Sequence, residues 1–316
     1  MLSRIAESLF WIGRYVERAE DTARILDVNI HHLLEAPLTS EAEMCRSLLS
    51  VMGVTLPPEQ METLSARRVT DVLAFDPTNP SSIVSSLTSA RVNARGVSEA
   101  ISSEMWEALN VTYNGLPTAL DLAARTAPYA FFRFVRERAA IIAGLSESTM
   151  SRDEAWRFMV LGRSLERVDM LTRLLAAAVT TADQDWVVLL RSCSAHEAFL
   201  RTYRREPEPT LATEFLLLDR LFPRSVFYSL VTAEECLAEL DPRSGRAGMP
   251  DEGRRVLGHL RTSLEFRRID DLVDELDELL VSLQKGCGAA SAAVAARYFR
   301  QTSPIEWSVE VVGVER

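Results

Sequence analysis

Apolar residues recur with the spacing of an α-helix along most of the chain. They return every third or fourth position, so at about 100° per residue they line one face of a helix. The apolar positions of one such segment are Ile12, Val16, Ala19, Ala23, Leu26 and Ile30. Those of a second segment are Leu161, Leu165, Val168, Thr172, Leu175 and Val179. Both segments are therefore predicted to be long helices with one apolar face.

Clusters of glycine, proline and small polar residues divide the rest of the chain into further helical stretches. One long helix is expected from Ser81 through Asn110. Gly115 and Pro117 are expected to mark its end. Only Ile305 to Val314 alternates and is rich in valine, which favours an extended tail. The patterns together predict an all-α fold, a multi-helix bundle of about ten or more helices.

A charged pattern occurs twice in the chain, 149 positions apart. The first copy reads Gly13-Arg14-x-x-Glu17-Arg18-x-Glu20-x-x-x-Arg24. The second copy reads Gly162-Arg163-x-x-Glu166-Arg167-x-Asp169-x-x-x-Arg173. A repeat of this length indicates two pseudo-equivalent units that face each other across a pseudo-twofold axis. We expect one co-folded domain over residues 1–301, with halves 1–147 and 148–301, followed by an extended C-terminal tail, 302–316.

The charged residues form a stripe on each predicted helix, opposite the apolar face. The stripe residues are Arg14, Glu17, Arg18, Arg24, Arg163, Glu166, Arg167 and Arg173. The spacing i, i+3 permits ion pairs within a helix. These are Arg14 with Glu17, Asp21 with Arg24, and Arg163 with Glu166. Met170 stands where the first copy has Asp21, so the second stripe has one more unbalanced positive position.

Three interpretations of the stripes remain open. They are solvated salt bridges on a surface, or a buried charged layer that sets the register of the two halves. In the third, unpaired arginines from both copies converge on an anionic ligand or on an acidic segment of a partner.

A polar cluster around a tryptophan is a second candidate site. Ser102 to Glu107 is expected in the middle of a helix, where serine has a low propensity. Its acids either pair with the stripe arginines around a core tryptophan or line a pocket beside the stripes. A counterpart is expected just before the second stripe. The pocket candidates are Glu104, Trp106, Glu107, Arg152 and Trp156.

Composition narrows the functional classes. With 47% hydrophobic and 25% charged residues, the chain has the composition of a soluble globular protein. The formal net charge of -10 argues against a nucleic-acid binder, because no pervasive basic surface is available for phosphates. The four cysteines are widely separated, so neither a disulfide framework nor a zinc ribbon is expected. No uncharged apolar stretch approaches the roughly 18 to 20 residues of a membrane span, so we expect a cytoplasmic protein.

Known catalytic patterns are weak in this chain. The segment Cys193–Glu197 could suggest a thiol or a metal site, but Leu200 replaces the second histidine of an H-E-x-x-H motif. The carboxylates of Asp270–Asp274 match a magnesium-binding pattern, although they continue into an acidic run that is typical of a solvated face. We therefore predict no catalytic residue, no metal and no cofactor.

Several segments, in order along the chain, resemble a known family. They are Met1–Glu20, Ile101–Asn110, Thr149–Phe158, Leu161–Arg167, Cys193–Ala198 and Glu214–Val226. Their sequences are similar to those of the bacterial alpha-E family, which is named for its helices and its E-R motif. The resemblance runs from residue 1 to about residue 300. It implies an accessory protein encoded beside an ATP-grasp amidoligase, often with a transglutaminase-like peptidase, and it carries over no catalytic residue.

We therefore expect a helical partner subunit of an ATP-grasp amidoligase system that forms peptide or amide bonds. The subunit would organise the ligase or its substrate in a protein complex. The alternative is an enzyme of the same pathway that acts on an amino-acid or peptide substrate. Glu17, Glu166 or Glu104 would then be the general base, and arginines would hold a carboxylate. A third hypothesis is a self-assembling scaffold, a homo-oligomer that docks through Ile305 to Val314.

Overall fold

The computed structural model describes residues 1–35, 40–181, 185–242 and 248–299, and for residues 62 and 269–274 it describes the backbone alone. Regular secondary structure within these ranges is entirely helical, which confirms the all-α prediction. The tail predicted for 302–316 and its valine-rich segment lie outside the described residues. The side chains of the Asp270–Asp274 pattern lie outside them as well.

Fourteen α-helices and one short π-helix follow one another along the described chain. Before residue 150 they are α1 (Ser3–Glu35), α2 (Glu41–Val51), α3 (Pro58–Glu62), α4 (Ala66–Thr70), the π-helix (Asp71–Phe75), α5 (Ile83–Arg95), α6 (Ser103–Arg125) and α7 (Tyr129–Thr149). After it they are α8 (Glu154–Val179), α9 (Trp186–Ser192), α10 (His196–Tyr203), α11 (Pro209–Leu218), α12 (Val226–Leu240), α13 (Glu252–Glu265) and α14 (Ile269–Tyr298).

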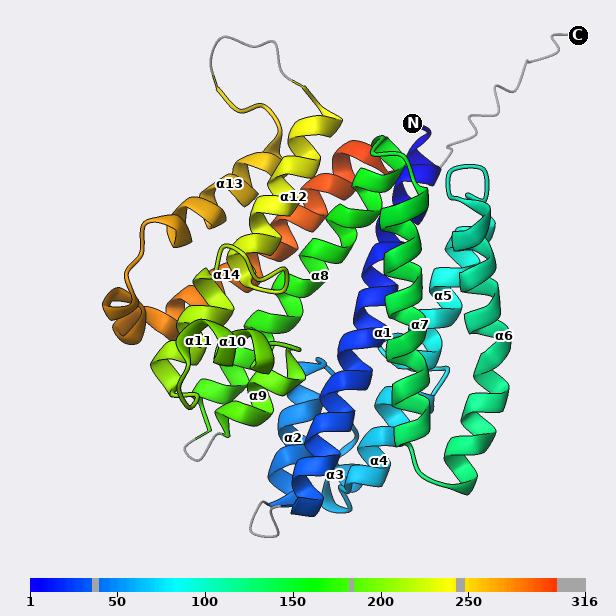
Figure 1. Cartoon of the computed structure of the whole chain (residues 1–316), viewed down its shortest axis with the longest axis vertical. Coiled ribbons are helices and arrows are strands. Elements are labelled where there is room, and N and C mark those ends of the chain that lie inside the picture. The colour runs from blue at the N-terminus through cyan, green and yellow to red at the C-terminus, as the bar shows by residue number, and fades with distance from the viewer. Residues whose placement is uncertain (36–39, 182–184, 243–247, 300–316) are drawn as a thin grey trace, which may run out of the picture.

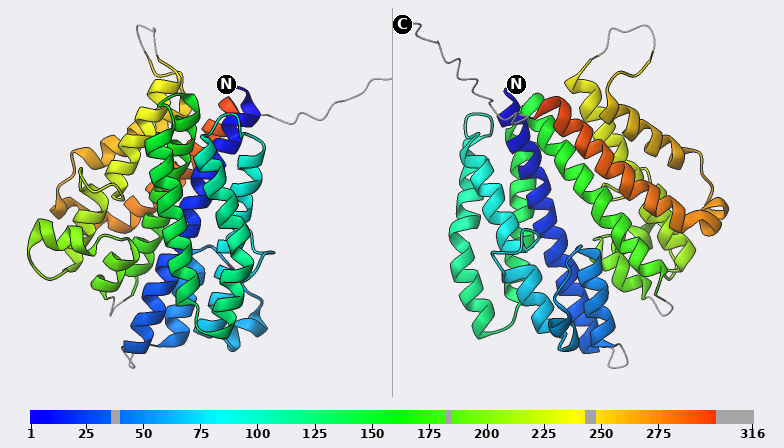
Figure 2. Two further views of the ribbon diagram at one scale, coloured as in Figure 1. Left: turned by 45° about the vertical axis from the view of Figure 1, so that its right-hand side comes forward. Right: turned by 180° about the vertical axis from the view of Figure 1, so that it is seen from behind.

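The two predicted repeat helices, α1 and α8, form the centre of the molecule. Figures 1 and 2 show them running side by side, with α5, α6 and α7 on one flank and α12, α13 and α14 on the other. α1 packs against α8, α5, α7 and α14, and α8 packs against α12 and α14 as well. Because α1 has helices on several sides, its polar positions are buried together with its apolar ones.

Two glycines allow α1 and α8 to approach closely. A Cβ atom on Gly13 would lie 2.0 Å from the carbonyl oxygen of Met159, and one on Gly162 would lie 2.0 Å from that of Phe10. Each carbonyl belongs to the residue three positions before the other helix's glycine, so the two contacts are equivalent. The pseudo-twofold axis implied by the repeat therefore passes through this crossing.

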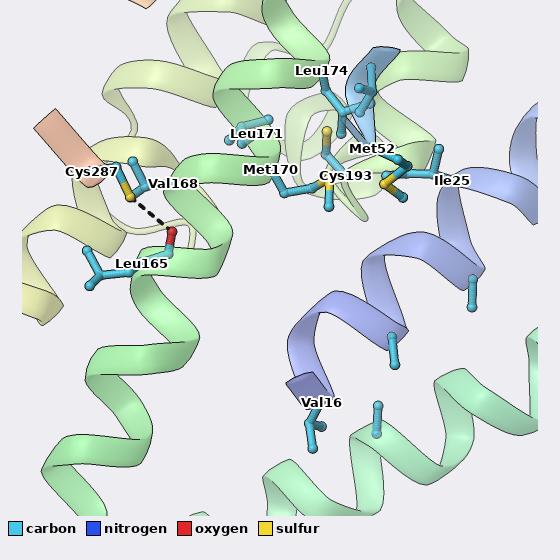
Figure 3. Packing of buried hydrophobic residues seen from close by; sticks show 14 of the residues in the cluster. Val16, Ile25, Met52, Leu165, Val168, Met170, Leu171, Leu174, Cys193 and Cys287 are labelled. Carbon is cyan, nitrogen blue, oxygen red and sulfur yellow. Dashed lines mark hydrogen bonds between the residues drawn. The ribbon is translucent and has the colours of Figure 1, made fainter. Parts of the chain in front are cut away.

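The apolar faces of α1 and α8 lie in one core that α14 completes. Ile12, Leu161 and Leu165 are fully buried. The Cys287 thiol of α14 donates a hydrogen bond to the carbonyl oxygen of Leu165, with 3.3 Å between sulfur and oxygen (Figure 3). Backbone and side chains of three distant segments thus meet in the same core.

The prediction of one long helix from Ser81 through Asn110 is wrong. α5 ends at Arg95, and α6 begins only at Ser103, with the Ser102 side chain accepting the backbone N–H of Met105 as an N-cap. Gly115 does not end α6 either. A Cβ there would lie 3.0 Å from the Phe134 ring, so the glycine lets α6 and α7 pack closely inside a continuous helix. Pro117 also lies within α6.

One stretch of α14 has the length and composition of a membrane-spanning helix. The segment is Glu275–Tyr298, and its most apolar window has a mean hydropathy of 1.3 and is 33% buried. α14 packs against α8 and α13 in the bundle. Core helices of soluble proteins meet the same criteria, so this segment is weak evidence for a membrane, and the cytoplasmic location stays a prediction.

Gly13→Ala is expected to destabilise the protein by about 2 kcal/mol or more, because the added methyl group would meet backbone that cannot move without separating α1 from α8. Gly144→Ala is the matched control, since nothing lies within 4 Å of its Cβ position on α7. That control should leave stability unchanged or raise it by up to about 1 kcal/mol. Urea unfolding of both variants tests the crossing, and equal stabilities would contradict it.

Candidate functional site

The two charged stripes meet where α1 and α8 cross. Stripe positions lie three and four residues apart on each helix, so their side chains project from one side. Arg14, Glu17 and Glu166 are only 8%, 3% and 2% exposed. α14 covers this side, since Arg14 donates a hydrogen bond to the Ser291 hydroxyl at 3.2 Å. The carboxylates and guanidinium groups therefore depend on one another rather than on water.

The two E-R motifs are paired reciprocally. Arg18 donates to Glu166 through Nε at 2.6 Å and through Nη2 at 3.1 Å. Arg167 donates to Glu17 through Nε at 2.6 Å and through Nη2 at 3.2 Å. The glutamate of each motif thus receives a bidentate bond from the arginine of the other motif, the strongest geometry for this pair of groups. The near-identical distances reflect the pseudo-twofold relation.

Pairs within a helix occur further along each stripe. Arg24 donates to Glu20 at 2.6 Å, and Arg173 forms the equivalent ion pair with Asp169 at 3.0 Å. Both pairs have i, i+4 spacing, which brings side chains together on a helix surface.

The i, i+3 pairs that the spacing permits are not the pairs observed. Glu17 pairs with Arg167 instead of Arg14, Arg24 pairs with Glu20 instead of Asp21, and Glu166 pairs with Arg14 and Arg18 instead of Arg163. The physical reason is the close crossing of α1 and α8, which offers Glu17 and Glu166 bidentate partners on the opposite helix.

The symmetry breaks at the outer arginines. Arg14 donates to Glu166 at 2.6 Å, whereas its equivalent, Arg163, bonds Glu147 of α7 at 2.8 Å. A residue outside the repeat, Arg224, takes the place beside Glu17. It lies in the loop between α11 and α12.

Arg224 contacts three carboxylates of α1. They are Glu17 at 2.9 Å, Glu20 at 2.6 Å and Asp21 at 2.7 Å. Sequence reasoning missed this residue, although it lies in the Glu214–Val226 segment that carries part of the family resemblance. No local pattern signals a partner 203 residues away from Asp21.

The pKa values of the carboxylates in the layer are shifted in different directions. Burial alone raises the pKa of Glu17, but attraction to Arg167 and Arg224 outweighs it and lowers that pKa to about 2. The pKa of Glu166 is lowered in the same way, with burial opposed by Arg14 and Arg18. Burial raises the pKa of Asp21 to about 7, against the attraction of Arg224, which it shares with Glu17 and Glu20. Glu17 and Glu166 are therefore weak bases.

The void at the Asp21 end of the charged layer is small. A void of about 20 Å³ lies beside Asp21, Cys193 and Arg224. A volume of this size holds roughly one water molecule. The burial of Arg14, Glu17 and Glu166 excludes the solvated-surface interpretation for these three residues, and the small void favours the buried layer over ligand binding at this position.

The two tryptophans among the five pocket candidates each have an arginine neighbour. Glu104 and Glu107 are exposed. The ring of Trp106 faces the Arg91 guanidinium at 5.8 Å, and the ring of Trp156 faces that of Arg152 at 4.1 Å. Each tryptophan thus lies in its own cation–π pair.

The polar cluster lies at a helix start and not in mid-helix. Ser102 is the N-cap of α6, and its hydroxyl lies 2.6 Å from that of Thr149 at the end of α7. Serine is favoured at an N-cap, so the low helix propensity that suggested a pocket has a local explanation.

The described cysteines have the properties of packing residues. All four are buried, and burial raises the pKa of Cys193 and of Cys287 to about 12. Thiols with such pKa values are poor nucleophiles at neutral pH. Among the described residues no three histidine, cysteine, aspartate or glutamate side chains are grouped to hold a metal ion.

The fold and the site define a class of protein, an all-α bundle organised around two reciprocally paired E-R helices. The chain belongs to the Alpha-E family, described as a predicted alpha-helical domain with a conserved ER motif, whose profile matches residues 1–299. This match confirms the family resemblance. The geometry supplies a reason for such a motif, because the glutamate of each motif binds the arginine of the other. Glu17 accepts from Arg167, and Glu166 accepts from Arg18.

Relatives of the chain include uncharacterized proteins of Mycobacterium bovis and Mycobacterium tuberculosis. Each is 28% identical to the chain over 309 residues. The matched region covers 89% of this chain and 35% of each relative, so the chain spans about a third of their length. No solved structure matches the chain.

Glu166→Ala is expected to lower the free energy of unfolding by about 3 to 5 kcal/mol, because it leaves the Arg14 and Arg18 charges buried without their carboxylate. Asp121→Ala is the control, since it removes the carboxylate of an exposed ion pair with Arg125 and should change stability little. Denaturant unfolding measures both. Equal small effects would show that the layer does not hold the helices together.

Stability should fall as the pH falls from about 4.5 toward 2. The folded pKa of Glu17, about 2, is below its ordinary value of 4.5, so its stabilisation is present above pH 4.5 and is lost as the carboxylate takes up a proton. The contribution is on the order of 3 kcal/mol. Glu17→Gln should be less stable at neutral pH and should lack this part of the acid dependence.

Asp21→Asn is a control, because the contribution of Asp21 to stability changes with pH in the opposite direction to that of Glu17. The pKa of Asp21 is raised to about 7, so its protonation adds stability as the pH falls from about 7 toward 4. The asparagine variant should lack that gain. Acid titrations of unfolding free energy that are parallel for the wild type and both variants would contradict the electrostatic description.

Proposed function

We propose that the chain is a helical partner subunit of an ATP-grasp amidoligase system, which organises the ligase or its substrate and does not itself perform the chemistry. The observation that carries the proposal is the internal pairing of both E-R motifs. The side chains that define the family bind each other, so they stabilise a scaffold. The family resemblance supplies the ligase as partner, and a transglutaminase-like peptidase of the same system is a further candidate.

The alternative, an enzyme with a glutamate as general base, has less support. Glu17 and Glu166 have lowered pKa values and are saturated with guanidinium donors, whereas a general base works best with a pKa near the operating pH. Glu104 is exposed and lies on α6, beside Ser103 rather than beside the charged layer. The void beside Asp21 and Arg224, about 20 Å³, also has no room for an amino-acid substrate.

The length of the relatives agrees with a role beside other modules. In the mycobacterial proteins the region similar to this chain accounts for 35% of the length, so there it is joined to a larger amount of other sequence. A domain that is joined to other sequence in those relatives is suited to working next to a second domain.

Copurification of this chain with the ATP-grasp protein of its system tests the proposal. We expect a stable complex and an ATP turnover by the ligase that depends on the subunit. Glu104→Gln serves as control for the enzymatic alternative, because its exposed side chain can be changed without disturbing the core, and it should leave turnover unchanged. Full ligase activity without this chain, or turnover abolished by Glu104→Gln in an intact complex, would overturn the proposal.

A further inference from the structure

One side of α14 faces outward along the described chain. In the right-hand view of Figure 2 this helix runs along the outside of the bundle, over α8 and beside α13. The most apolar window of the helix is only 33% buried. Val281 is 47% exposed, and Gly288, Ala289 and Ala292 are exposed further along. Positions three or four apart share one side of a helix, so these residues form a continuous strip of small and apolar side chains.

A groove of about 780 Å³ lies between α13 and α14 at this strip. Val256 and Leu260 line it from α13. Val281 and Ala289 line it from α14. A helix of a partner that lay along α14 would therefore cover apolar surface, which is the main source of affinity in an interface.

Acidic and basic side chains of the groove lie at different places along α14. Asp277 and Glu278 come first, and Lys285 follows about two turns later. All three are exposed, and none forms an ion pair with another side chain of the described chain. In contrast, the neighbouring Glu275 pairs with Arg267 at 2.8 Å. The strip thus presents two carboxylates at one end and an ammonium group at the other.

The groove has no strong excess of either charge. Its remaining charged residue, Arg255 of α13, pairs with Glu252 at 2.6 Å. Charge therefore favours neither an acidic nor a basic partner. It favours a surface that carries the same two charges in the opposite order.

A second copy of this chain is such a surface. Glu278 lies three residues before Val281, and Lys285 lies three residues after Ser282. When two α14 helices run antiparallel, a twofold axis midway between Val281 and Ser282 puts Glu278 of each copy opposite Lys285 of the other. The contact is isologous, so this pair occurs twice. A parallel arrangement would instead bring equal charges together.

We propose that α14 is a homodimer interface, in which two copies of the chain pack their α14 helices antiparallel across Val281 and Ser282. The groove and the apolar strip provide the affinity. The pairs of Glu278 with Lys285 set the orientation, because exposed ion pairs add little to affinity but facing like charges oppose association. This contact differs from the self-assembly through Ile305 to Val314 that the sequence suggested, and it does not depend on the ligase.

Sedimentation equilibrium of the full chain measures the dimer. Lys285→Glu and Glu278→Lys should each weaken dimerisation by at least about tenfold, because each substitution places like charges opposite each other. An equimolar mixture of these two variants should form a heterodimer about as tightly as the wild type dimerises, since both facing pairs are again of opposite sign. That rescue also shows that both variants are folded.

Val281→Asp should prevent dimerisation as well, because it places two carboxylates close to the twofold axis. Val92→Asp is the matched control, since Val92 is 59% exposed on α5 and lies outside the strip. It should dimerise as the wild type does.

Crosslinking tests the contact without a substitution. Lys285 is the only lysine of the chain. A carbodiimide, which joins an amine directly to a carboxylate, should therefore link Lys285 of one copy to Glu278 or Asp277 of the other. Peptide mapping of the covalent dimer identifies the linked residues, and a dimer linked elsewhere would contradict the antiparallel arrangement.

Two other results would overturn the interface. One is a wild type that stays monomeric at high concentration. The other is a wild type that dimerises while the mixture of Lys285→Glu and Glu278→Lys stays monomeric. If a monomeric wild type cosediments with phosphatidylcholine vesicles and Val281→Asp does not, a lipid surface covers the strip and the dimer is wrong.

Discussion

Reciprocal pairing of two E-R motifs is the constraint on which the rest of the structure depends. The four charges of the two E-R motifs lie between α1 and α8, and a buried charge without a partner costs several kcal/mol. Each glutamate accepts from the arginine of the other helix, so neither helix can satisfy its own motif. Gly13 and Gly162 bring the backbones close enough for these side chains to meet. The register and the spacing of the helices are therefore set together.

Local patterns predicted much of this arrangement. Periodicity and duplication identified the two central helices, and motif spacing identified the charged residues, because both depend on neighbouring positions. The partners were not predictable, because which carboxylate Arg18 reaches depends on how two helices cross. Arg224 was missed for the same reason. The break before α6 was missed for a different reason. Ser102 is a recognisable N-cap, but the helical pattern placed it in a helix interior.

The residues that define the family are not the residues that the protein exposes on its surface. The E-R motifs are internal, so a match to them reports the fold, and a fold does not by itself specify a function. Any contact with a partner has to use other, exposed residues, because Glu17 and Glu166 are buried between the helices. Arg224 connects the buried layer to the surface. It pairs with Glu17 and Glu20 of the layer, and it lies in the loop between α11 and α12.

The position of Arg224 has a consequence for how the chain is made. During translation α1 emerges before α8 and Arg224, with Glu17, Glu20 and Asp21 on its surface. The arginine that these acids share is synthesised more than 200 residues later. Until then the polar side of α1 stays hydrated, because burying carboxylates without counterions is unfavourable. The charged side of α1 is thus completed only after Arg224 has been synthesised, and in that interval it is accessible to chaperones.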